Sequence, residues 1–142
     1  MGTRSRIGIL NPDNTVTSTY CHWDGYPSGV GSDLLKQYKD EAKIRALLSL
    51  GHISQLGAEV APPDGAIHSF SNPIRGVTVA YGRDRGDVQR ISDPHSIDNW
   101  PLCGAEFLYL YNPESKEWQC KACGEGEWQS IPAAIVADRG GA

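Results

Sequence analysis

The segment YCHWDGY (residues 20–26) gathers three aromatic side chains, an imidazole, a carboxylate and a thiol in seven residues. Large aromatic side chains in a connecting segment are typical of recognition, because Trp and Tyr contribute strongly to binding. His22 and Asp24 suggest a second interpretation, an acid–base pair. In a third, Trp23 and Tyr26 only pack a hairpin against neighbouring helices. The sequence predicts a partner-binding loop with these contact residues: Tyr20, His22, Trp23, Asp24 and Tyr26.

Four arginines follow later in the chain, around one apolar alternating run: Arg75, Arg83, Arg85 and Arg90. Guanidinium groups suit phosphates and carboxylates, which they bind in a bidentate manner. The first three are therefore candidates for binding an anionic or nucleotide-like ligand. Asp84 and Asp87 lie among them, so a solvated turn of internal ion pairs is the alternative interpretation.

The cysteines offer a third kind of chemistry. Cys120 and Cys123 form a CxxC pair, and a tetrahedral zinc ion needs two further ligands. Cys103 and His95 could complete that set, which predicts a zinc-stabilised module as one alternative and zinc as the only candidate cofactor. The other interpretation is that the cysteines are small buried residues. A redox role is disfavoured, because this CxxC ends a strand instead of opening a helix.

Signatures of common enzymes are missing. The chain has no GxxxxGK[ST], GxGxxG, GxSxG or HExxH motif. No catalytic residue is predicted, and a protein without catalytic activity is favoured. The alternative is a small enzyme that processes nucleotides or phosphates, with His22 and Asp24 in acid–base roles and Arg83 and Arg85 holding phosphate.

Local patterns predict the elements that position these residues. Two β-type runs around the turn formers NPDN predict a hairpin over residues 4–21, and a second hairpin over 106–123 turns at NPES. Ser32 can cap a helical segment over 32–50, whose apolar stripe ends before Gly51. Residues 51–87 predict a long loop and then a strand in which Val77, Val79 and Tyr81 alternate.

These blocks predict a single α+β domain over residues 1–142. We expect antiparallel hairpins in a small sheet that packs against two short helices. Strand and helix patterns are segregated along the chain, which favours an α+β fold. The sixteen glycines and nine prolines predict many loops, while 39% hydrophobic residues suffice for a core.

Charge and hydropathy restrict the partners. A net charge of −4 argues against a protein that coats nucleic acid, and no apolar run is long enough to span a membrane. We expect a cytoplasmic protein, because the first residues lack an apolar signal segment. Its expected partner is a host protein or a small anionic ligand. An apolar face of Tyr109, Tyr111 and Trp118 is either core or an interface between copies of the chain.

Three segments together resemble a family of small, largely uncharacterised proteins encoded by bacteriophages and prophages: MGTRSRIG, YCHWDGYPSGVG with its following helix, and HSFSNP…GVTVAYGRDRGD. The likeness runs from Met1 to about Asp87, and EFLYLYNPESKEWQC resembles the family's C-terminal hairpin. The resemblance implies a phage accessory protein that binds a host component in the bacterial cell, for host takeover or inhibition of defence. It implies no catalytic residues, and the CxxC departs from the family pattern.

Overall fold

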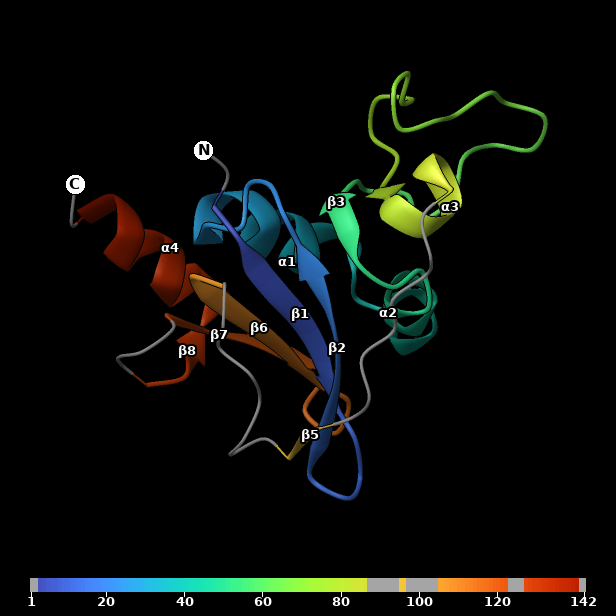
Figure 1. Cartoon of the computed structure of the whole chain (residues 1–142). Helices are drawn as coiled ribbons and strands as arrows, with labels where there is room; N and C mark the ends of the chain where they lie inside the picture. The colour runs from blue at the N-terminus through green and yellow to red at the C-terminus, as the bar shows by residue number, and fades with distance from the viewer. Residues whose placement is uncertain (1–2, 87–94, 97–104, 123–126, 141–142) are drawn as a thin grey trace.

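The computed structural model of the chain describes residues 3–86, 95–96, 105–122 and 127–140. It is an α+β fold, as predicted, with helices beside one mixed sheet (Figure 1). The strands are β1 Ser5–Leu10, β2 Thr15–Cys21, β3 Ile53–Gln55, β4 Val79–Ala80, β5 His95–Ser96, β6 Phe107–Asn112, β7 Glu117–Ala122 and β8 Gln129–Ser130. The helices are the π-helical turn η1 Pro27–Gly31, α1 Ser32–Gln37, α2 Glu41–Leu48, α3 Tyr81–Arg85 and α4 Ile131–Gly140.

Two antiparallel hairpins, β1–β2 and β6–β7, form the centre of the sheet, as the two turn clusters predict. A parallel pairing of β1 with β6 joins them, with Ile7 opposite Tyr109. The strand order is β4-β3-β2-β1-β6-β7-β8, and β5 pairs with β2. Because β1 and β6 are parallel, both hairpin turns lie at the same end of the sheet.

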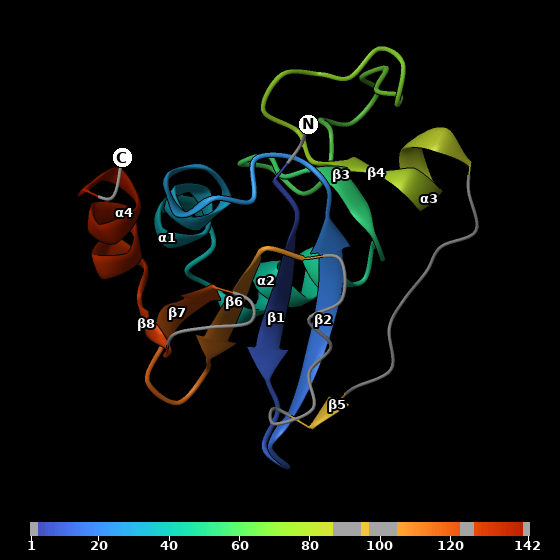
Figure 2. The ribbon, with the colours of Figure 1, turned by 60° about the vertical axis from the view of Figure 1, so that its left-hand side comes forward.

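The main core lies on one face of this sheet, beneath the helices (Figure 2). Ile7 and Ile9 point to that face, where they join side chains from the helices, among them Leu34, Tyr38, Ile44, Leu47 and Ile131. Each fully buried side chain of this size stabilises the fold by about 1.5–3 kcal/mol. Tyr109, Tyr111 and Trp118 are buried in the same core, so this aromatic face is interior.

The opposite face of the sheet carries a smaller apolar cluster near the hairpin turns. Val16, Leu108 and Leu110 are buried there, with Leu10 and Trp128 packed against them. Towards the other end of β2 the same face carries Ser18 and Tyr20, because side chains alternate along a strand. This face is therefore apolar at one end and polar or aromatic at the other.

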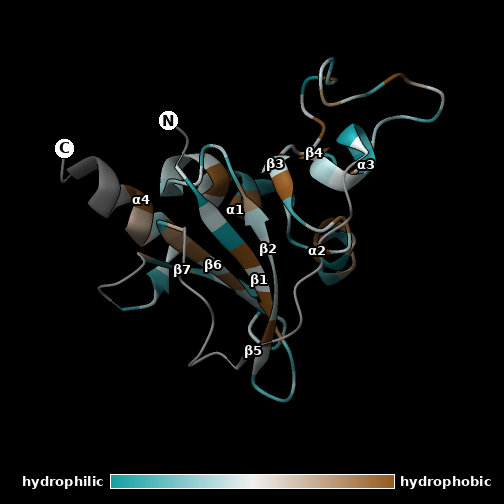
Figure 3. Cartoon of the chain, in the orientation of Figure 1, coloured by the Kyte–Doolittle hydropathy of each residue, from teal (hydrophilic) through white to brown (hydrophobic). Residues whose placement is uncertain are grey.

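Two elements interrupt the loop predicted over residues 51–87. β3 pairs with β2 and β4, and α3 begins at Tyr81, where the alternating pattern predicts a continued strand. The prediction that Tyr81 belongs to a strand was wrong, because the Asp84 carboxylate accepts the Ala80 N–H at 2.8 Å and stabilises the first turn of a helix. In Figure 3, α3 is coloured hydrophilic and the neighbouring β3 hydrophobic, which suits an exposed helix beside a buried strand.

Candidate binding surface

Four rings lie in a row where β2 ends and β3 begins, and we call them the aromatic array: Tyr20, His22, Trp23 and His52. The centroids of Tyr20 and His52 are 5.7 Å apart, those of Tyr20 and His22 6.0 Å, and those of His22 and Trp23 4.9 Å. His22 and Trp23 meet edge to face at 88°, a geometry that contributes about 0.5–1.5 kcal/mol. The array is a continuous aromatic surface.

Strand geometry positions the array. Cys21 points into the core, so Tyr20 and His22 on either side of it point to the opposite face. The N–H of His22 donates to Ile53 O at 3.2 Å, and that of Trp23 donates to Ser54 O at 3.0 Å. These bonds extend the parallel contact of β2 with β3 and fix the backbone that carries the rings.

The aromatic residues at the end of this segment face solvent. The exposed fraction is 43% for Trp23 and 37% for Tyr26, so each ring presents part of its surface to solvent while the rest is covered by protein. The loop behind them is held by internal bonds from Gly29 N–H to Tyr26 O at 2.9 Å and from Val30 N–H to Asp24 O at 2.8 Å. Two large side chains are therefore displayed on an ordered loop.

His22 and Asp24 have different partners and do not form an acid–base pair. His22 Nδ1 lies 2.8 Å from the Tyr20 hydroxyl, whereas the Tyr26 hydroxyl donates to Asp24 Oδ1 at 3.4 Å. Burial raises the pKa of Tyr20, and the nearby Asp24 charge raises the pKa of Tyr26, so both hydroxyls stay protonated at neutral pH. The hydroxyls serve as hydrogen-bond donors, and the geometry supports recognition better than proton transfer.

The predicted arginine group does not converge on one site. Arg75 lines a cavity of about 490 Å³ with Asp33 and Gln55, away from α3. Arg83 instead donates to Val60 O and Thr78 O, each at 2.6 Å, and to Asp84 Oδ1 at 2.8 Å. Arg90 lies outside the described residues. Protein oxygens thus engage the Arg83 guanidinium, and we assign it no ligand.

Arg83 belongs to a network that also contains His68 and Asp84, which we call the His68 latch. His68 Nε2 lies 3.2 Å from both Asp84 Oδ2 and Thr78 O, and its Nδ1 accepts the Ile74 N–H at 3.0 Å. A catalytic His–Asp pair needs one ring nitrogen facing a reactant. Here the His68 side chain is 1% exposed and both nitrogens are engaged, so the latch is structural.

Arg85, a predicted anion-binding residue, lies over two aromatic rings. Its guanidinium stacks 4.6 Å from the Tyr81 ring centroid and 4.8 Å from that of Phe70. The Tyr81 N–H donates to His52 O at 3.3 Å, which joins α3 to the array. Arg85 therefore borders the aromatic surface through Tyr81, where cation–π contacts hold it in place.

The predicted zinc ligands lie on different strands. His95 lies on β5, which pairs with β2, whereas Cys120 lies on β7, with β2, β1 and β6 between them. Four strand spacings are about 19 Å, so His95 and Cys120 are too far apart to share one ion. Cys103 and Cys123 lie outside the described residues, and within the described part no three His, Cys, Asp or Glu side chains gather as a metal site.

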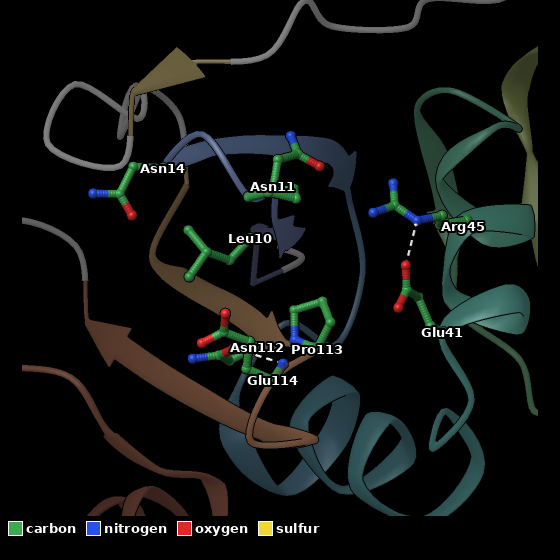
Figure 4. Close-up of a pocket in the computed structure, with 9 residues that line it drawn as sticks. Leu10, Asn11, Asn14, Glu41, Arg45, Asn112, Pro113 and Glu114 are labelled. Atoms are coloured by element: carbon green, nitrogen blue, oxygen red, sulfur yellow. Dashed lines mark hydrogen bonds and ion pairs between the residues drawn. The ribbon is translucent and has the colours of Figure 1, made fainter.

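A small cavity lies between the two hairpin turns and α2 (Figure 4). It measures about 240 Å³, below the roughly 300–1,000 Å³ of most ligand sites. Two of its charged side chains are paired with each other: Arg45 Nε donates to Glu41 Oε2 at 2.9 Å across its wall. We assign this cavity no ligand.

Comparison with protein families, curated proteins and solved structures finds no match for the chain. The phage resemblance and its implied function therefore stay predictions. Among the described residues, no helix has the length and apolar character that crossing a membrane requires.

Sequence reasoning missed one member of the array and the core of the latch. His52 follows the glycine that closes a helix, and His68 lies in a predicted loop, so neither belongs to a motif. Their roles arise from contacts with residues 16 to 32 positions away, Asp84 for His68 and Tyr20 for His52. No local pattern encodes contacts of that length.

Proposed function

We propose that this chain is a non-catalytic binding protein that recognises a host component in the bacterial cytoplasm, in the manner of a phage accessory protein. The supporting observation is that Trp23 and Tyr26 are exposed on a loop whose backbone is fixed. An ordered exposed Trp loses little conformational entropy on binding, and residues of this type dominate interface energies.

The array beside Trp23 favours a flat or apolar contact over a purely ionic one. His22, Tyr20 and His52 continue the surface, and Arg85 with Tyr81 adds a cation at its border. Rings and a guanidinium together suit a protein patch or a nucleotide-like anion. Both fit a protein that occludes or sequesters a host component without turning it over.

The test compares the double variant Trp23→Ala/Tyr26→Ala with wild type. Tagged protein is purified from bacterial lysate, and native mass spectrometry records retained proteins and small molecules. We expect a component present with wild type to fall at least tenfold in the double variant, since each hot-spot truncation costs about 2 kcal/mol or more. Loss of that component with an intact circular dichroism spectrum supports the proposal.

Ile67→Ala is the matched control, because Ile67 is an 85% exposed apolar side chain in a different loop. It should retain the same component as wild type. Equal retention by all three proteins would sink the proposal, as would turnover of the retained small molecule that disappears in His22→Ala, which would favour the enzyme alternative.

A further inference from the structure

A third cavity lies on the far side of the molecule from β3, between α1, the β6–β7 hairpin and the start of α4. It measures about 560 Å³, well within the range of small-molecule sites. We call it the Trp118 cavity. None of the residues predicted from sequence to bind a ligand lines it, and it shares no lining residue with the aromatic array.

Apolar side chains form its walls: Leu35 from α1, Tyr111 and Trp118 from the hairpin, and Pro132 from α4. The Trp118 Nε1–H donates to Tyr38 O at 2.8 Å, and the rings of Tyr111 and Trp118 pack with centroids 5.2 Å apart. Tyr111 is 2% exposed and Trp118 5%, so these packed rings form a fixed floor of which a small part reaches the cavity, and Leu35 and Pro132 supply the more accessible apolar walls. A preformed apolar floor lowers the entropic cost of binding.

The rim of the cavity is cationic in a protein whose net charge is −4. Lys39 and Lys116 line it together with a single carboxylate, Glu117. Lys116 is held at the hairpin turn by a bond from its N–H to Asn112 O at 2.7 Å. Within the described residues neither lysine forms an ion pair, whereas Arg45 and Arg83 each pair with a carboxylate.

Polarity also orients a ligand within the cavity. The pKa of Tyr111 is raised by burial and, to a smaller extent, by the charges of Glu41 and Asp40. Negative charge on a ligand is therefore favoured at the lysines, and its apolar body at the uncharged walls.

We propose that the Trp118 cavity binds a small amphipathic organic anion. Its apolar body packs against Leu35 and Pro132, over the buried rings of Tyr111 and Trp118, and its carboxylate, sulfonate or phosphate group lies at Lys39 and Lys116. The site is independent of the aromatic array, and its failure would leave the proposed function untouched.

The test uses 8-anilinonaphthalene-1-sulfonate, a fluorescent amphipathic anion, and N-phenyl-1-naphthylamine, its uncharged counterpart. Wild type should bind one sulfonate probe per chain. Lys39→Glu/Lys116→Glu should raise the Kd of that probe at least about tenfold, because two favourable charge contacts become repulsive. Affinity for the uncharged probe should stay within about twofold of wild type, since the apolar walls are unchanged.

Lys36→Glu/Lys43→Glu makes the same change of total charge at two lysines that do not line the cavity. This control should bind the sulfonate probe like wild type, and Trp23→Ala/Tyr26→Ala should do the same. Equal weakening by both lysine pairs would overturn the proposal, because the effect would then come from overall charge. Binding of several probe molecules without saturation would overturn it too, as would wild-type affinity in Lys39→Glu/Lys116→Glu.

Discussion

Gly25 is the residue at which the candidate loop approaches the N-terminal segment most closely. A Cβ atom there would lie 2.6 Å from Thr3 O, the oxygen that accepts the Gly25 N–H at 2.8 Å. Gly25→Ala should therefore lower the free energy of unfolding by about 1–3 kcal/mol, as overpacking does, because backbone has to shift. Urea denaturation followed by circular dichroism measures this loss.

A second variant measures the opposite case, backbone strain without a clash. Gly65 has φ of +79° and nothing within 4 Å of its Cβ position, so Gly65→Ala meets only backbone strain of about 1 kcal/mol. A Gly25→Ala variant as stable as wild type would show that the close approach to Thr3 contributes nothing.

The sequence predicted the part of the candidate site that stands out by its local composition. The segment with Trp23 and Tyr26 stands out by composition, and its exposure follows from the turn chemistry around Gly25 and Gly29. The arginines were predicted as one group from their spacing. In the structure Arg83 forms hydrogen bonds to protein oxygens, and Arg75 lines the cavity that also contains Asp33 and Gln55. Side-chain partners depend on tertiary contacts, which spacing alone does not encode.

At the scale of elements, the His68 latch joins α3 to the long loop and to the outer edge of β4. Burial alone would raise the pKa of Asp84, but hydrogen bonds from Arg83 and the Ala80 N–H outweigh it and hold that pKa below its ordinary value. The carboxylate thus favours folding above the unfolded-state pKa of about 3.9, and this stabilisation is lost as pH falls through the lower folded-state pKa.

Asp84→Ala should therefore destabilise the protein by about 2–3 kcal/mol at pH 7, because the Ala80 N–H loses its acceptor and Arg83 and His68 each lose a charged hydrogen-bond partner. Urea titrations of wild type and variant at pH 7 and pH 3 measure the difference, which should shrink at the lower pH. Asp64→Ala, at an exposed position of the same loop, should behave like wild type. A difference that grew on acidification would contradict the assigned role of the carboxylate.

The elements that sequence predicts well are those with local patterns. Both hairpins have turn formers between alternating runs, and the helices over residues 32–50 have an apolar stripe. β3 is only three residues long and α3 five, too short for either period to show. The parallel pairing of Ile7 with Tyr109 joins positions far apart in sequence. No local pattern predicts which distant strands pair, so only the structure shows this contact.

On the scale of the whole molecule, one sheet contains both hairpins, and the face of that sheet beneath the helices forms the main core. Cys21 on β2 and Cys120 on β7 are both buried in that core, with β1 and β6 between them. A domain of this size commonly unfolds as one cooperative unit. The two thiols should then become accessible together.

Cysteine alkylation tests that cooperativity. Burial raises the pKa of Cys21 to about 12, so the thiol is overwhelmingly protonated at pH 8, and it is shielded as well. Under native conditions we expect iodoacetamide to leave Cys21 and Cys120 unlabelled over the time in which a free cysteine reacts completely. Peptide mapping across a urea series should then show both labelled at one midpoint, coincident with the loss of circular dichroism. Labelling of Cys120 at lower urea than Cys21 would mean that β7 separates from the sheet before β2, and the molecule would then have two unfolding units in place of one.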